Sequence, residues 1–244
     1  MLRAVTFDYW NTLFVDVRGR DRERRRVEIL RAELEALGRV VSPTALDDAL
    51  QTGFDFFDRV WIAEHRTPSC GELVDSILAV LGAHFPEAAR ERLVSRFELL
   101  VLDLPPEPMP GAIYTLPALA ERYRLAVVCD TAYSPGSVLR EVLERNGMLA
   151  YFEYLYFSNE HGMSKPDVRV FQLTLAALDV RAPEAAHVGD IQRTDIAGAQ
   201  AAGMAAVHFI GANNYDARRS TADLMVRHFD ELPAALGGLT CAGC

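Results

Sequence analysis

The sequence predicts an α/β protein, in which a doubly wound, mostly parallel sheet carries a bundle of helices inserted after its first strand. Short apolar segments alternate with helical patterns toward the C-terminus, and an earlier region shows helical patterns only. A proline-rich segment separates the two regions. We therefore expect an α/β core from residues 1–15 and 104–236, a helical cap from residues 16–103, and a flexible tail from residues 237–244.

The first strand and the cap are read from apolar spacing. Residues 3–8 form a short apolar run that ends in Asp8, as expected of a buried strand. In the region that follows, apolar residues recur at helical spacing, with charges between them. Gly38 is placed to end one helix, and Ser42 and Pro43 are typical of the start of the next. The expected cap helices cover residues 21–37, 42–63, 71–81 and 86–100.

Residues 104–111 contain four prolines, which resist both a helix and a central strand. We interpret this segment as the hinge where the chain leaves the cap. Because strands and helices alternate beyond it, the strands should be parallel, and their carboxyl ends should meet at one crevice. The expected strands are residues 125–129, 154–157, 186–189 and 205–210, and the expected helices are residues 113–123, 137–146, 168–178 and 194–202.

The composition restricts the partners. The 244 residues carry a net charge of −9, which argues against nucleic acid or an anionic membrane as the main partner. A small anionic substrate remains compatible, because local charge can oppose net charge. No apolar run reaches the ~18 residues of a membrane span, and the N-terminus lacks the pattern of a signal peptide, so we expect a cytoplasmic protein. A monomer and a homodimer both remain open. The Cys241–Cys244 pair is expected in an unstructured, reduced tail.

Polar residues follow the expected strands at four places. They include two or three carboxylates, one lysine and several small polar groups. This set suits Mg²⁺ and a phosphoryl group, since Mg²⁺ prefers oxygen ligands, a lysine balances substrate charge, and an aspartate can attack covalently. The residues are Asp8 to Thr12, Cys129 to Thr131, Lys165, and Asp190 with Asp195.

In their order and spacing, these residues resemble the haloacid dehalogenase superfamily of hydrolases across essentially the whole chain. That family's first motif is an aspartate, any residue, usually a second aspartate, and then commonly Gly-Thr. Its later motifs are a lysine, commonly before proline, and an acidic pair after a strand. The resemblance implies a Rossmann-like core with an inserted cap. The matching segments are Asp8-Tyr9-Trp10-Asn11-Thr12, Ser164-Lys165-Pro166-Asp167, and His187-Val188-Gly189-Asp190 with Asp195, continued by Gly198 and Ala201-Ala202-Gly203-Met204.

The resemblance also implies roles for these residues. Asp8 would be the nucleophile and a Mg²⁺ ligand, with the main-chain carbonyl of Trp10 and the carboxylate of Asp190 as further ligands. Asp195 would ligate or support the metal, and Lys165 would neutralise the nucleophile and the transferred group. The implied reaction is in-line attack on phosphorus, which gives an aspartyl-phosphate that water hydrolyses. Residues expected at the substrate are Trp10, Asn11, Thr12, Cys129, Asp130, Thr131 and His65.

Two positions depart from the family pattern. Trp10 stands where the second aspartate would protonate the leaving group and activate water, a loss that typically costs about 10²–10⁴-fold in rate. We expect Trp10 to form a wall of the pocket. Where the second motif has Ser or Thr, this chain has Cys129, whose thiol is the weaker donor, and Thr131 two residues later is the alternative. Asp130 would add unfavourable negative charge unless it points away or pairs with a cation.

Three functional interpretations follow from Trp10. The first is a Mg²⁺-dependent hydrolase for phosphoryl groups with good leaving groups, such as acyl phosphates, or one whose cap supplies the acid. The second is a carbon-centred hydrolase, since the family's 2-haloacid dehalogenases also carry an aromatic residue there and need no metal. The third is a weakly active or inactive binding protein. The intact Gly189-Asp190 step and Asp195 favour the metal-dependent interpretation.

The cap supplies further candidates. Six arginines follow the first motif, and most should lie on a solvated helix face, with one of them reaching the crevice as the alternative. Trp61, His65 and Arg66 lie near the end of the second cap helix, where the family's cap residues often face the substrate. His65 is either a surface histidine or the missing acid–base group. Phe54, Phe56, Phe57 and Trp61 should form the cap's core. The six arginines are Arg18, Arg20, Arg22, Arg24, Arg25 and Arg26.

Overall fold

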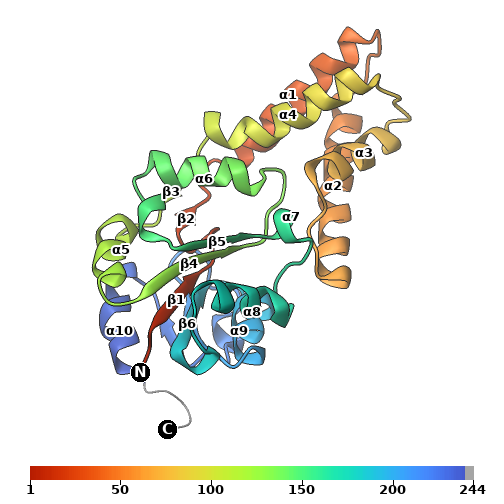
Figure 1. The fold of residues 1–244 in the computed structure, drawn as a ribbon. Helices are drawn as coiled ribbons and strands as arrows, with labels where there is room; N and C mark the ends of the chain where they lie inside the picture. Colours follow the sequence, from red (N-terminus) through yellow and green to blue (C-terminus); the bar gives the residue numbers. More distant parts are fainter. Residues whose placement is uncertain (240–244) are drawn as a thin grey trace.

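A computed structural model describes residues 1–239. Its main feature is a six-stranded sheet with the order β5-β4-β1-β6-β7-β8, in which every neighbouring pair is parallel (Figure 1). The predicted fold class is therefore confirmed. The edge strand β8 was not predicted, because its three residues are too few for a period-two pattern. The strands are β1 (Ala4–Phe7), β4 (Arg124–Cys129), β5 (Tyr154–Phe157), β6 (Ala185–Gly189), β7 (Ala205–Phe209) and β8 (Leu224–Val226).

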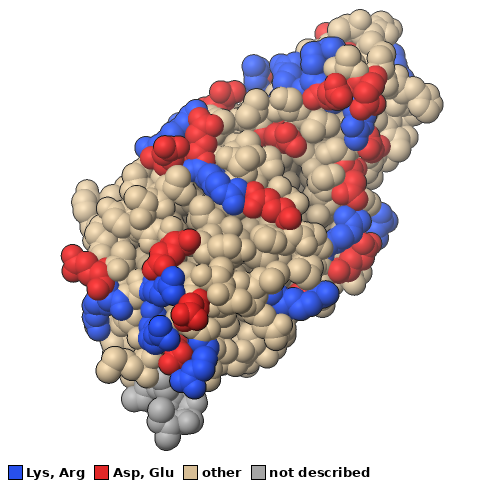
Figure 2. Space-filling model, in the orientation of Figure 1, with Lys and Arg blue, Asp and Glu red and all other residues tan. Residues whose placement is uncertain are grey.

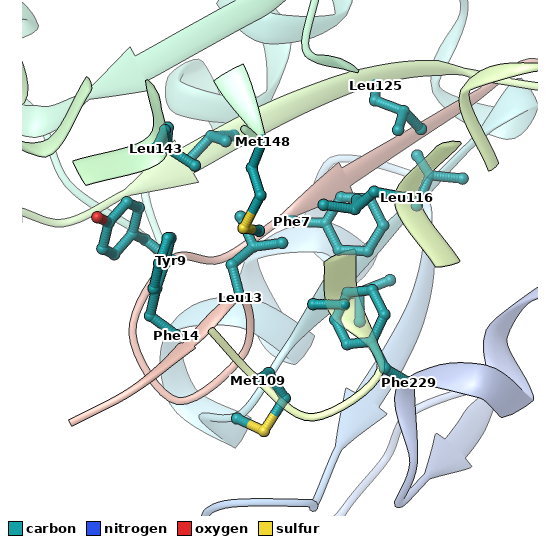
Figure 3. Close-up of a cluster of buried hydrophobic side chains, with 14 of the residues drawn as sticks. Phe7, Tyr9, Leu13, Phe14, Met109, Leu116, Leu125, Leu143, Met148 and Phe229 are labelled. Carbon is teal, nitrogen blue, oxygen red and sulfur yellow. The ribbon is translucent and has the colours of Figure 1, made fainter. Parts of the chain in front are cut away.

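Helices cover both faces of this sheet, because alternate strand residues point to opposite faces. In β4, Val127 contacts one apolar cluster with α5, α6 and α10, whereas Val128 contacts another with α8 and α9. Figure 3 shows the first cluster, where the rings of Phe7 and Phe229 stack with centroids 5.8 Å apart. The helices are α5 (Ala112–Ala120), α6 (Gly136–Arg145), α7 (Ser158–His161), α8 (Val168–Ala177), α9 (Ala197–Ala201) and α10 (Leu232–Gly238).

The ends of the expected elements differ in two places that matter. Helix α10 continues two residues into the segment expected as a tail, whereas the Cys241–Cys244 pair lies outside the described residues. The helix expected over residues 194–202 begins instead as a π-helical segment, η3, which is followed by α9. The segment η3 spans Gln192–Ile196. The short 3₁₀ helices are η1 (Leu149–Tyr151), η2 (Ala182–Glu184), η4 (Ala217–Arg219) and η5 (Phe229–Glu231).

The four cap helices lie beyond the carboxyl end of the sheet (Figure 1). They enclose an apolar cluster of their own that includes Leu30, Leu73 and Phe97. Two short strands join cap and core, since β2 and β3 pair antiparallel where the chain enters and leaves the cap. The prolines of the hinge tolerate β3 because it is only two residues long and lies at an edge. The elements are β2 (Phe14–Val15), β3 (Glu107–Pro108), α1 (Gly19–Ala36), α2 (Pro43–Glu64), α3 (Cys70–Val80) and α4 (Glu87–Asp103).

The surface carries charges of both signs side by side. Figure 2 shows acidic and basic side chains next to one another on the visible face. Ion pairs join many of the protein's charged side chains, for example Arg124 with Glu153 and Arg145 with Glu141. Among residues 1–239, no helix is both long and apolar enough to span a membrane.

The packing of α9 against the loop before α8 gives a stability prediction. A Cβ on Gly198 would lie 2.6 Å from the Phe171 ring and 3.1 Å from the Pro166 backbone. Gly198→Ala should therefore destabilise the protein by about 1–3 kcal/mol, the usual cost of overpacking. Gly237→Ala is the matched control, since the nearest atom is 3.5 Å away. It should be neutral or stabilising by up to ~1 kcal/mol. Urea unfolding measures both, and equal effects would contradict this account of the packing.

Candidate active site

A cleft lies between the carboxyl end of the sheet and the cap. Because β1 lies between β4 and β6, the residues that follow these strands converge there: Asp8, Asp130 and Asp190. Lys165 arrives from the loop before α8, and Asp195 from η3. The cleft encloses about 310 Å³. Its lining residues are Asp8, Trp10, Asn11, Asp16, Gly19, Arg22, Glu23, Arg26, Phe54, Phe57, Trp61, Val101, Asp130, Ala132, Tyr133, Ser134, Lys165, Asp190, Ile191, Thr194 and Asp195.

Lys165 joins two of the carboxylates. Its Nζ donates to Asp8 Oδ1 at 2.5 Å and to Asp195 Oδ1 at 2.6 Å, and all three side chains are buried. Burial lowers the pKa of the Lys165 ammonium, but Asp195 and Asp8 outweigh burial and hold this pKa well above its ordinary value. Lys165 therefore stays charged at the bottom of the cleft.

Asp195 is held by more groups than Lys165 alone. Its Oδ2 accepts the Ile191 N–H at 2.9 Å, and its Oδ1 lies 3.1 Å from His187 Nε2. Burial raises the pKa of Asp195, yet Lys165 and the His187 hydrogen bond outweigh burial and bring this pKa well below its ordinary value. A Cβ on Gly189 would lie 2.4 Å from Asp195 Cγ, so only glycine at this strand end leaves room for the carboxylate.

His187 supports Asp195 as a neutral imidazole, a role that sequence reasoning missed. It is fully buried, and burial lowers its pKa. Its Nδ1 lies 2.8 Å from Thr6 Oγ1 and its Nε2 faces Asp195, so the tautomer that carries the Nε2 proton satisfies both contacts. This role depends on the register of the sheet, which places Thr6 of β1 directly beside His187 of β6 and which the sequence alone does not specify.

The site carries more negative than positive charge. Burial raises the pKa of Asp8 well above its ordinary value, with the charges of Asp195 and Asp190 adding to burial and Lys165 opposing it. Burial and Asp195 raise the pKa of Asp190 to about 7, against a hydrogen bond from Asn213 Nδ2 to Asp190 Oδ2 at 3.0 Å. Three buried carboxylates thus face a single ammonium.

A divalent cation fits this arrangement. Within residues 1–239, no group of three or more His, Cys, Asp or Glu side chains has the geometry of a metal site. The expected ligand set needs only two carboxylates, Asp8 and Asp190, with the main-chain carbonyl of Trp10, while Asp195 is already bonded to Lys165 and His187. These oxygen donors are those that Mg²⁺ prefers, and their surplus negative charge is what a divalent cation would offset.

The loop after β1 brings Trp10 and Asn11 to the cleft but not Thr12. The Trp10 ring packs edge-on against Tyr9, with centroids 5.1 Å apart, and lies 5.7 Å below the Arg22 guanidinium carbon. Asn11 has a left-handed backbone with φ of 57°, and its N–H donates to Phe14 O at 2.6 Å. Thr12 is buried behind this turn, and its hydroxyl has no hydrogen-bond partner among the described residues.

Cys129 and Thr131, the two alternatives for the second motif, are not among the residues that line the cleft. Strand alternation turns the Cys129 thiol into the cluster that contains Val127, and burial raises the pKa of this thiol. The Thr131 hydroxyl lies 3.1 Å from Ser158 Oγ, away from the cleft. Residues with a hydroxyl group that do line the cleft are Tyr133 and Ser134 in the loop after β4 and Thr194 in η3, and sequence reasoning did not identify them.

Asp130 faces the cleft and links cap to core. Its Oδ2 accepts a hydrogen bond from Trp61 Nε1 at 2.9 Å, and its Oδ1 accepts one from the Lys165 N–H at 3.0 Å. Burial raises the pKa of Asp130, while Lys165 and these hydrogen bonds oppose the rise. The unfavourable charge expected at this position is thus offset by neutral donors and by the nearby ammonium. The centroid of the Trp61 ring also lies 4.2 Å from the guanidinium carbon of Arg193.

The cap contributes other residues than those expected. His65 does not line the cleft: it is exposed at the end of α2, where its carbonyl accepts the Ser164 N–H at 2.8 Å. Phe54, Phe57 and Trp61 line the cleft in addition to packing within the cap. Two of the six arginines, Arg22 and Arg26, are buried and line the cleft, and the other four are exposed.

Comparison with known proteins agrees with this fold. A family model described as haloacid dehalogenase-like hydrolase matches residues 2–203. Among solved structures, a 2-haloacid dehalogenase from Pseudomonas syringae pv. Tomato is 25% identical with a TM-score of 0.69, and the match covers 97% of this chain and 99% of that one.

Several of the curated relatives are named as phosphatases. A ribulose-1,5-bisphosphate 5-phosphatase from Halopiger xanaduensis is 45% identical over 32% of this chain and 33% of its own length. The chain thus matches about one third of that relative. A glyceraldehyde 3-phosphate phosphatase from Methanopyrus kandleri is 28% identical over 96% of this chain and 91% of its own length.

The bond between Trp61 and Asp130 gives a second prediction. Trp61→Phe should destabilise the protein by about 1.5–3 kcal/mol, because it removes a donor from a buried carboxylate. The same substitution in an Asp130→Ala background serves as the control and should cost clearly less. Urea unfolding of the four proteins measures the coupling. Equal costs in both backgrounds would show that the ring packing of Trp61, rather than its hydrogen bond, connects cap and core.

Proposed function

Because the chain belongs to the haloacid dehalogenase-like hydrolases, we propose that it hydrolyses a small phosphorylated substrate through an aspartyl-phosphate on Asp8, with Mg²⁺ as cofactor. The observation that carries this proposal is the position of Asp8. Its carboxylate lies at the bottom of the cleft, in contact with a lysine that stays charged. A carboxylate beside a fixed ammonium can act as a nucleophile while an anionic phosphoryl group approaches.

Each side chain then has a defined task. An oxygen of Asp8 attacks phosphorus in line, and the bond from phosphorus to the leaving oxygen breaks as the new bond forms. Lys165 offsets the charge on Asp8 and on the transferred oxygens. Asp195, fixed by His187 and the Ile191 N–H, holds Lys165 in place. Water then attacks phosphorus, releases phosphate and regenerates Asp8.

Asp8, the Trp10 carbonyl and Asp190 would hold Mg²⁺. When bound, the cation supplies positive charge that balances the carboxylates and the phosphoryl oxygens. The excess of carboxylates over ammonium groups at the site supports this assignment, as does the chemistry of the three oxygen donors.

Trp10 restricts the leaving group. An indole transfers no proton, so a leaving group that departs as a stable anion has an advantage over an alkoxide. His65 does not line the cleft, so we do not assign it the role of the missing acid. We therefore propose acyl phosphates, or esters of similarly acidic groups, as the best substrates. The names of the curated relatives support small phosphorylated molecules as the wider class.

The second candidate is hydrolysis at carbon with a halide leaving group. It is favoured by Trp10, since a halide leaves without a proton, and by the likeness to the dehalogenase from Pseudomonas syringae. In that reaction Asp8 would attack carbon and expel the halide, and water would cleave the resulting ester. This chemistry gives no role to the Asp190 carboxyl group beside Asp8 and Asp195, which is why we rank it second.

Leaving-group dependence tests the proposal. Wild type should hydrolyse acetyl phosphate at least ~10²-fold faster than glycerol 3-phosphate. The alkoxide of glycerol needs a proton as it leaves, and the loss of a general acid typically slows such a step by at least ~10²-fold. EDTA should abolish both activities, and so should Asp8→Asn. Trp10→Asp should raise turnover of glycerol 3-phosphate and change that of acetyl phosphate little.

Phosphate release by wild type and the two variants measures these rates. Similar rates on both substrates would contradict the role given to Trp10. Chloride release from 2-chloropropionate in EDTA, without phosphatase activity, would favour the second candidate instead.

A further inference from the structure

One buried cation in the cleft has no counter-ion. Lys165 pairs with Asp8 and Asp195, and Arg22 pairs with Asp16 and donates to Leu104 O at 2.7 Å. Within residues 1–239, the guanidinium of Arg26 forms no ion pair and no hydrogen bond, although the side chain is only 6% exposed. Its Nε is completely buried without a partner. Buried charges are normally paired, so this arrangement requires an explanation.

Aromatic rings fix the position of Arg26. Its guanidinium carbon lies 4.0 Å from the centroid of the Tyr133 ring and 6.0 Å from that of Phe97. Rings in this position attract a cation without using its N–H donors. The four N–H donors of Nη1 and Nη2 therefore have no partner among the described protein residues, and their planar arrangement matches a carboxylate or a phosphate.

The surroundings of Arg26 offer no substitute anion. Glu23 also lines the cleft and its charge acts on Arg26 from a distance, but it is exposed and forms no ion pair with Arg26 among the described contacts. The neighbouring walls of the cleft, Phe54 and Val101, are apolar. The Tyr133 hydroxyl is likewise buried without a partner, close to Gly53, where a Cβ would lie 3.1 Å from it. A cation that is held by rings and faces a cleft is arranged to receive an anion from solution.

We propose that Arg26, positioned by the ring of Tyr133, binds a second anionic group of the substrate, a carboxylate or a phosphate at the end opposite the reacting phosphoryl group. The proposal rests on the proposed function for the identity of the reacting end. It narrows the substrate class from phosphorylated molecules in general to those with two anionic ends. Arg26 then determines specificity from the cap, while Asp8 and Lys165 act from the core.

Binding to matched ligands tests this proposal. In an Asp8→Asn background, which prevents turnover, we expect 3-phosphoglycerate to bind at least ~10-fold more tightly than glycerol 3-phosphate, since the two differ by one carboxylate. The affinities of ribulose 1,5-bisphosphate and ribulose 5-phosphate test in the same way whether the second anion is a phosphate. Titration calorimetry gives the dissociation constants. A preference in either pair supports the proposal and identifies the second anion, whereas equal affinities in both pairs overturn it.

Substitutions then assign the preference to Arg26. Arg26→Met should abolish the preference, and Arg26→Lys should retain part of it, since an ammonium keeps the charge but loses the fork. The control Arg25→Met, an exposed neighbour on the same helix, should retain it in full. Tyr133→Phe should also retain it, because the ring remains. A preference that survives in Arg26→Met would contradict the proposal.

Thermal unfolding separates this inference from the proposed function. Without ligand, Arg26→Met should melt no lower than wild type, because the substitution removes an unpaired buried charge. A clear decrease would indicate a purely structural role and overturn the proposal. Glycerate, compared with glycerol at equal millimolar concentration, should stabilise wild type but not Arg26→Met. If glycerate stabilises wild type but not Arg26→Met and no phosphate ester is hydrolysed, the proposed function fails and the anion site is supported. If phosphate esters are hydrolysed, but glycerate does not stabilise wild type and the ligand pairs bind equally, the anion site fails and the proposed function is supported.

Discussion

The contact of Lys165 with Asp8 and Asp195 is the interaction on which the rest of the site depends. Three buried charges cost several kcal/mol each unless they are paired in good geometry. The fold provides that geometry by ending β1 and β6 side by side and by turning η3 back toward them. Gly189 leaves the space for Asp195, and His187, on the same strand β6, orients its carboxylate. Without the Lys165 ammonium, these features would hold buried carboxylates close together with no charge to balance them.

The core and the cap both bring charged groups to the cleft. The core presents four carboxylates around Lys165. The cap side presents two buried arginines, Arg22 and Arg26, beside the carboxylates of Asp16 and Glu23. An anionic substrate that must approach the carboxylate of Asp8 thus meets positive charge on both of its flanks, from Lys165 below and from the cap above. The hydrogen bond from Trp61 to Asp130 holds the cap over the site, so the same contact brings the arginines to the substrate. Trp10 completes this enclosure but adds no proton carrier.

Much of this architecture was predictable because it follows from strand ends. Asp8, Lys165, Asp190 and Asp195 come together as the parallel strands require. The second motif was less informative: strand alternation turns Cys129 into the core with Val127, and Ser158, far away in sequence, engages the Thr131 hydroxyl. Arg22 and Arg26 were indistinguishable from four exposed arginines by composition. Their spacing of four residues, followed by Ile29 and Leu30, marks the buried face of α1 and was the signal available in the sequence. The π-helical turn of η3, which brings Asp195 to Lys165, depends on tertiary contacts that no local pattern specifies.

Unfolding free energies of Lys165→Met, Asp195→Asn and the double variant test the central role of this charge cluster most directly. Lys165→Met alone should cost about 3–5 kcal/mol, since it leaves buried carboxylates without a partner. Adding Asp195→Asn to it should recover at least ~1 kcal/mol, because one of the unpaired charges is then removed. Costs that simply add would contradict the account, and would mean that Lys165 and Asp195 stabilise the fold independently.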